Sequence, residues 1–203
     1  MFVGSCSTTE RYKSLWNATS KNAPASVLHQ ENGMTLKVSN DATMLYIEVA
    51  SNSESTIAKI KELGLAMWLS AGTSPRKTFG IYYPLPYKGM EKKVVLDGFS
   101  YANSVPIPLQ EIAPMRIAAT FSQEEMLYKV QISLDEIQFS STDVFTIQMA
   151  SFAEGKEEYL SGLTTEEEIE RRLDKYKANP DYQHNENELL PFFYVFELAK
   201  MPE

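Results

Sequence analysis

The chain is poor in the residues that most enzyme and metal sites require. It has two histidines, His29 and His184, and a single cysteine, Cys6, which excludes an intrachain disulfide. No His-x-x-x-His pair, Gly-x-Ser-x-Gly, Gly-x-Gly-x-x-Gly or phosphate-binding loop occurs. We therefore expect no catalytic residue, no metal and no cofactor.

Clustered positive charge and long apolar runs are also missing. The formal net charge is −8 and the basic residues are scattered, which disfavours a nucleic-acid partner because phosphate binding needs clustered Lys and Arg. No apolar run approaches the roughly 20 residues of a membrane-spanning helix. An apolar fraction of 43% is nevertheless enough for a full core, and 203 residues suit one domain.

The sequence does contain many short stretches in which apolar and polar residues alternate, the pattern of strands with one buried face. The predicted strands are residues 34–39, 44–50, 65–70, 77–83, 93–96, 115–121, 126–134, 144–152 and 192–198. The last of them is apolar on both faces, which indicates a strand with neighbours on both sides. The pattern predicts an all-β fold, an antiparallel two-sheet β-sandwich of jelly-roll-like form.

One or two short helices should accompany the strands. In residues 55–63 the apolar residues have helical spacing, and Gly64 is a natural C-cap. Residues 164–177 begin with a capping-box pattern and end before a proline, which predicts a second, acidic helix. Seven prolines and glycines interrupt residues 84–114, and we expect a long surface excursion there with few strand residues.

The N-terminal residues resemble the end of a bacterial lipoprotein signal peptide. Val3-Gly4-Ser5 precedes Cys6, which would then be lipidated, and a polar segment follows it. The alternative is a chance match, since a signal peptide has an apolar stretch of about 7–15 residues and the given sequence has only Met1, Phe2 and Val3. We predict a signal-peptide remnant and tether in residues 1–26, docked through Leu15 and Trp16, and one sandwich domain in residues 27–203.

Three motifs resemble the superfamily of family 9 carbohydrate-binding modules, whose sandwich is shared with DOMON domains. They are Asn-Asp followed by Leu-Tyr-Ile-x-Val in residues 40–49, Gly-Leu-x-x-Trp-Leu in 64–69, and Phe-Gly-Ile-x-Tyr-Pro in 79–84. The resemblance covers roughly residues 30–200 and describes scaffold strands and turns. It implies a β-sandwich, and its sugar-binding members clamp a glycan between aromatic rings.

Four aromatic residues form the candidate ligand site. Trp68 faces away from Met67 and Leu69, and an exposed indole can stack on the C–H face of a pyranose. Tyr82 shares its side of the sheet, and two more tyrosines lie on the long excursion. The candidate ligand-binding residues are Trp68, Tyr82, Tyr87 and Tyr101. The alternative is a Trp68 covered by residues 55–63 or 84–114.

Carboxylates and methionines offer two further readings of the chain. A carboxylate pair for glycoside hydrolysis would stand about 5–10 Å apart, and Glu48 and Glu197 interrupt apolar strands, although solvent-facing or salt-bridged side chains are the simpler interpretation. Some DOMON domains ligate haem through Met and His. Here Met34, Met67, Met115, Met126 and Met149 fall on inward faces, which indicates core filling.

These observations favour a non-catalytic binding module of the bacterial cell envelope. Its partner would be a glycan or another small polar ligand held by loop-borne aromatics, and its membrane contact would be a lipid anchor at Cys6 alone. The alternative is a structural or interaction domain that docks an envelope protein through residues 84–114 and the acidic helix. An enzyme is the third hypothesis, and nothing in the residue spacing supports it.

Overall fold

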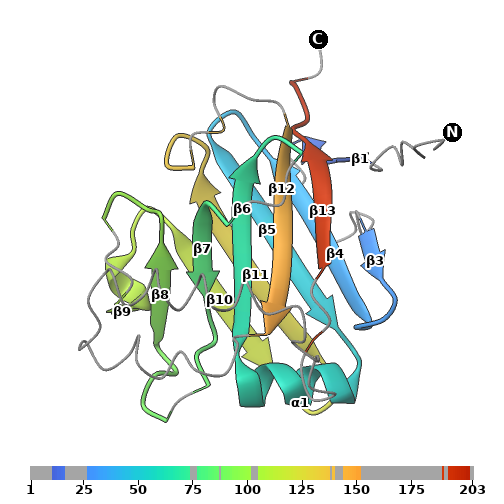
Figure 1. Ribbon diagram of the computed structural model, residues 1–203, viewed down its shortest axis with the longest axis vertical. Coiled ribbons are helices and arrows are strands. Elements are labelled where there is room, and N and C mark those ends of the chain that lie inside the picture. Colours follow the sequence, from blue (N-terminus) through green and yellow to red (C-terminus); the bar gives the residue numbers. More distant parts are fainter. Residues whose placement is uncertain are drawn as a thin grey trace, which may run out of the picture.

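The structure is a computed structural model, and it describes residues 11–16, 27–73, 77–86, 88–101, 105–137, 139, 144–151, 189 and 192–201. Two β-sheets lie face to face in this part of the chain, and α1 lies across one end of them (Figure 1). The long strand pairs are antiparallel. The predicted two-sheet β-sandwich is therefore confirmed.

One sheet has seven strands in the order β1-β13-β12-β6-β7-β8-β9. They are β1 (Arg11–Lys13), β6 (Leu65–Ala71), β7 (Phe79–Tyr82), β8 (Lys93–Asp97), β9 (Pro106–Pro108), β12 (Val144–Ser151) and β13 (Phe192–Glu197). β13 has a neighbour on each side, as its two apolar faces predicted. β9 is unexpected, and its prolines are tolerated because an edge strand leaves one side unpaired.

The other sheet has six strands in the order β10-β11-β5-β4-β2, with β3 also paired to β4. They are β2 (Leu15–Trp16), β3 (Val27–His29), β4 (Met34–Asn40), β5 (Met44–Ser51), β10 (Arg116–Phe121) and β11 (Met126–Ser133). The four longest of them match the predicted strands to within one or two residues, the usual uncertainty of element ends.

The predicted first helix is present as α1 (Glu54–Leu63). The Ser53 hydroxyl caps its start by accepting a hydrogen bond from the Thr56 N–H, and Gly64 ends it with a φ of 73°. A short 3₁₀ turn, η1 (Leu109–Glu111), follows β9. Within the described residues, no helix is long and apolar enough to cross a membrane.

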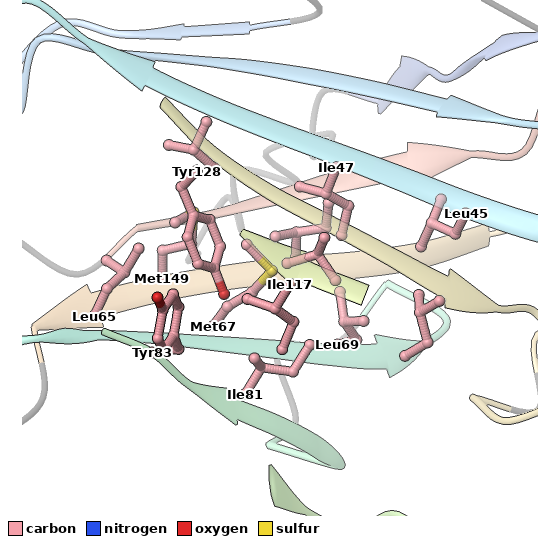
Figure 2. Close-up of a cluster of buried hydrophobic side chains, with 14 of the residues drawn as sticks. Leu45, Ile47, Leu65, Met67, Leu69, Ile81, Tyr83, Ile117, Tyr128 and Met149 are labelled. Carbon is pink, nitrogen blue, oxygen red and sulfur yellow. The ribbon is translucent and has the colours of Figure 1, made fainter. Parts of the chain in front are cut away.

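The core lies between the sheets and is filled by the side chains that point inward at alternate positions along the strands. Figure 2 shows Tyr128 of β11 and Tyr83 pointing toward each other across it, with ring centroids 6.3 Å apart. The buried methionines predicted as core filling are confirmed as such: Met34, Met67, Met115, Met126 and Met149.

The N-terminal segment docks at Leu15 and Trp16, as predicted, and it also pairs with the other sheet. Arg11–Lys13 pairs in parallel with β13 of one sheet, and Leu15–Trp16 pairs in parallel with β4 of the other. The segment therefore belongs to both layers of the sandwich. Short parallel pairings to distant strands leave no alternation in the sequence, which is why the pattern did not show them.

Several predictions fall outside the described residues. They concern the lipidation at Cys6, the ligand role of Tyr87, the helix over residues 164–177 and the tether in residues 1–10 and 17–26. The division between residues 26 and 27 therefore stays a prediction.

Candidate functional site

Two of the predicted site residues lie side by side on the outer face of the seven-stranded sheet. Trp68 of β6 and Tyr82 of β7 pack edge to face, with ring centroids 5.9 Å apart and planes at 88°. The indole Nε1–H donates a hydrogen bond to the Tyr82 hydroxyl at 3.2 Å. The strand pairing predicted for these two residues is thus present.

Neither of these rings is open to a ligand. Trp68 is 5% exposed and Tyr82 is 6% exposed, because Leu85 and Met90 of the long excursion pack over them. The Lys77 ammonium lies over the indole ring, 4.1 Å from its centroid, which is a cation–π contact. The expectation of an exposed stacking platform is corrected here, and the covered alternative is the one observed.

Tyr101 lies elsewhere in the molecule. It is 37% exposed, it packs beside Phe99 of the main core, and its hydroxyl donates to Glu136 Oε2 at 3.4 Å. Burial and the adjacent Glu136 carboxylate raise the pKa of Tyr101. The structure therefore brings Trp68 and Tyr82 together and leaves Tyr101 apart from them.

The carboxylate proposed as an alternative polar contact is salt-bridged. Glu48 lies on the outer face of the six-stranded sheet, 3.5 Å from the Lys37 ammonium and 3.0 Å from that of Lys129. The salt-bridged interpretation of Glu48 is confirmed. Among the described residues, no group of three or more His, Cys, Asp and Glu side chains is close enough to hold a metal ion.

His29 closes one side of the sandwich between β3 and β13. Its ring stacks on Phe192 with centroids 4.1 Å apart, and its Nδ1 is 3.0 Å from the Tyr194 hydroxyl. Nε2 lies 3.3 Å from the Glu31 carboxylate. Burial lowers the pKa of His29 although Glu31 opposes the shift, so the imidazole is neutral at pH 7 and serves packing between the sheets.

A hollow of about 340 Å³, which we call the end hollow, is lined by residues at or just beyond the ends of β4, β11 and β13. The end of β13 near the C-terminus lies at the end of the sandwich opposite α1 (Figure 1). Four parts of the chain meet at the end hollow. It is lined by Trp16, residues 40–42, Leu134, Asp135, Phe139 and residues 198–201. The sequence indicated Trp16 only as an anchor of the N-terminal segment, and the four segments that line the hollow share no local pattern that would have predicted it.

A hydrogen-bonded turn forms one wall of the end hollow. Asp41 Oδ1 accepts hydrogen bonds from the backbone N–H groups of Thr43 and Met44 at 2.8 and 2.9 Å. Asp41 Oδ2 accepts one from the Tyr46 hydroxyl at 2.8 Å. These donors outweigh the cost of burial and lower the pKa of Asp41, so the carboxylate stays ionised and is held in one orientation.

The rest of the end hollow combines apolar surface with charge. Phe139 is buried, where its ring packs on Phe145 at 5.1 Å, whereas Trp16 is half-buried. The exposed side chains of Asp135 and Lys200 complete the lining. An indole beside the fixed carboxylate of Asp41 can hold a small ligand that has apolar C–H surface and hydroxyl groups.

Comparisons with known proteins add little to this geometry. No known family's sequence profile matches the chain, and no curated protein matches it. A solved structure of a carbohydrate binding module family 9 from Caldicellulosiruptor kristjanssonii in complex with glucose matches at 9% identity with a TM-score of 0.35, covering 95% of this chain and 85% of that one. Similarity this low carries no argument about the ligand, and the family resemblance stays a prediction beyond the β-sandwich itself.

Proposed function

We propose that this protein is a non-catalytic binding module that takes a carbohydrate in the end hollow. The observation that supports the proposal is the pairing of a half-buried indole, Trp16, with the oriented carboxylate of Asp41 in a hollow of about 340 Å³. That volume is within the range of about 300–1,000 Å³ typical of small-ligand sites.

The chemistry of the lining favours a sugar over a purely apolar ligand. Trp16 offers a flat apolar face for the C–H groups of a pyranose. Among the described residues, Asp41 Oδ2 accepts a hydrogen bond from the Tyr46 hydroxyl, and a carboxylate oxygen has room for a second donor such as a sugar hydroxyl. Asp135 adds another acceptor at the rim.

The proposal keeps the cell-envelope location and the lipid anchor at Cys6, which rest on the Val3-Gly4-Ser5-Cys6 sequence alone. Expression in a bacterium with a lipoprotein signal peptide supplied upstream tests the anchor. Mass spectrometry should then find a lipidated Cys6, and a Cys6→Ser variant should lose the lipid and leave the membrane fraction. An unmodified Cys6 would contradict this part of the proposal.

Binding is tested by titrating tryptophan fluorescence with glucose, galactose, mannose, xylose and N-acetylglucosamine and with short oligosaccharides of each. The chain has two tryptophans, so the variants Trp68→Phe and Trp16→Phe separate their signals. We expect a saturable change in wild type and in Trp68→Phe and none in Trp16→Phe. Flat emission with every sugar would reject the proposal and favour the interaction-domain hypothesis.

A further inference from the structure

The N-terminal segment Arg11–Trp16 steps from one layer of the sandwich to the other beside the end hollow. Ser14 joins β1, which pairs with β13, to β2, which pairs with β4. Trp16, the aromatic wall of the end hollow, is the last residue of β2. The position of this wall therefore depends on how the segment docks.

A buried cluster of hydrogen bonds fixes the docking. Ser14 is 3% exposed; its N–H donates to the Glu197 carbonyl at 3.0 Å, and its hydroxyl donates to Asn40 Oδ1 at 2.5 Å. The Ala199 N–H donates to the Ser14 hydroxyl at 2.8 Å. The Asn40 amide donates to the carbonyls of Ala199 at 3.0 Å and Asp41 at 3.1 Å.

The cluster ties together three of the segments that line the end hollow. They are Trp16, residues 40–42 and residues 198–201. Because the groups are buried, removal of one partner leaves another without a hydrogen bond, which is costly in a low-dielectric interior. Ser14 and Asn40 thus control whether the walls of the end hollow stay assembled.

The contacts of the segment with the sheets are otherwise short. β1 pairs through three residues and β2 through two, and Leu15 and Trp16 are only half-buried. Segments with few buried contacts are those that open locally at low free-energy cost. A ligand that contacts Trp16 in the docked state alone would oppose this opening.

We propose that sugar binding in the end hollow and docking of Arg11–Trp16 are linked, with Ser14 and Asn40 as positioning residues for the site. The linkage rests on the proposed function; the positioning role does not. Linkage is reciprocal, so a sugar that binds the docked state fastens the N-terminal segment, and loss of docking weakens the sugar.

The positioning role is tested without any ligand, by backbone hydrogen exchange of residues 11–16 in wild type, Ser14→Ala and Asn40→Ala. Thr56→Val is the matched control, since the Thr56 hydroxyl donates a buried hydrogen bond to the Asn32 carbonyl at the α1 end. We expect exchange in residues 11–16 to accelerate at least about tenfold in Ser14→Ala and in Asn40→Ala and to stay unchanged in Thr56→Val. Equal protection in all four proteins would overturn the proposal.

The linkage is tested with the panel sugar that changes Trp16 fluorescence. It should slow exchange in residues 11–16 of wild type, and its affinity for Ser14→Ala, a variant outside the lining of the end hollow, should be at least about tenfold lower than for Thr56→Val. Equal affinities, or exchange that the sugar leaves unchanged, would overturn the linkage. If no sugar binds wild type, the linkage and the proposed function fail, while the ligand-free experiment still decides the positioning role.

Discussion

The two tryptophans of this protein occupy opposite kinds of environment. Trp68 is sealed on the outer face of the seven-stranded sheet by Leu85, Met90 and the Lys77 ammonium. Trp16 is half-buried on a two-residue strand beside the end hollow. The comparison teaches that the exposure of a strand residue depends on what distant segments bring over it, and only partly on the strand to which it belongs.

The largest expected effect is on stability. Trp68→Ala should lower the free energy of unfolding by about 3–5 kcal/mol, because the covering side chains cannot fill the space left by a buried indole. Trp16→Ala should cost about 1–2 kcal/mol, since its ring is only partly removed from water. Chemical denaturation of both variants measures the difference, and equal losses would contradict the assignment of Trp68 as sealed and Trp16 as open.

Deletion of a single tyrosine hydroxyl should change the free energy of unfolding in opposite directions in the core and beside the end hollow. The Tyr128 hydroxyl is buried in the core with no hydrogen-bond partner among the described residues (Figure 2), so Tyr128→Phe should raise the free energy of unfolding by about 1 kcal/mol. Tyr46→Phe removes a hydrogen bond to the Asp41 carboxylate and should lower it by about 1 kcal/mol.

Urea denaturation of the two variants checks this pair, and each serves as the control of the other because the chemical change is the same. A destabilised Tyr128→Phe would show that its hydroxyl has a partner. A neutral Tyr46→Phe would show that the Asp41 turn is not held by this contact.

Acid should lower the free energy of unfolding through His29, which lies between β3 and β13. Its pKa is lowered from the ordinary value of 6.5 by burial, so the unfolded chain binds a proton more readily than the folded one. The contribution of His29 to stability is complete above pH 6.5 and is lost as pH falls below it toward the lowered pKa. Besides its ring partner Phe192, the groups that face it are the Tyr194 hydroxyl and the Glu31 carboxylate.

His29→Phe is the variant that isolates this effect, since it keeps a flat ring against Phe192 and removes the group that binds the proton. Chemical denaturation at several values between about pH 5 and pH 8 measures the free energy of unfolding. As the pH is lowered, this free energy should fall less in His29→Phe than in wild type. Identical pH profiles would show that His29 has the same pKa in both states.

The smallest expected effect concerns the exposed face of the six-stranded sheet. Glu48→Gln removes the ion pairs with Lys37 and Lys129. Because these side chains are partly exposed and water screens the charges, the loss should be below about 1 kcal/mol. Thermal unfolding at low and high salt measures it, and a larger, salt-independent loss would contradict a screened surface contact.

Much of the sandwich could be predicted because its long strands carry a local signal. The alternation of Leu45, Ile47 and Val49 with polar residues defines β5, and Gly64 marks the end of α1. The side of the sheet on which Trp68 lies also followed from this alternation. These features need only neighbouring residues to be read.

The rest depended on contacts between distant parts of the chain. The cover of Trp68 comes from Leu85 and Met90 in a proline-interrupted excursion without periodicity. The segments that contain Trp16, Asn40 and Ala199 are joined at the end hollow by strand pairings of two or three residues and by a cluster of side-chain hydrogen bonds. The adjacent Leu15 and Trp16 in a polar stretch were the available signal, and they indicated docking without its location.

The most direct test of the end hollow as the ligand site uses the two indole N–H signals in a ¹H–¹⁵N NMR spectrum, assigned with Trp16→Phe. Titration with the sugars of the fluorescence panel should shift the Trp16 signal progressively to saturation and leave the Trp68 signal in place. A shift of Trp68 alone, or no shift of either signal with any sugar, would contradict the account.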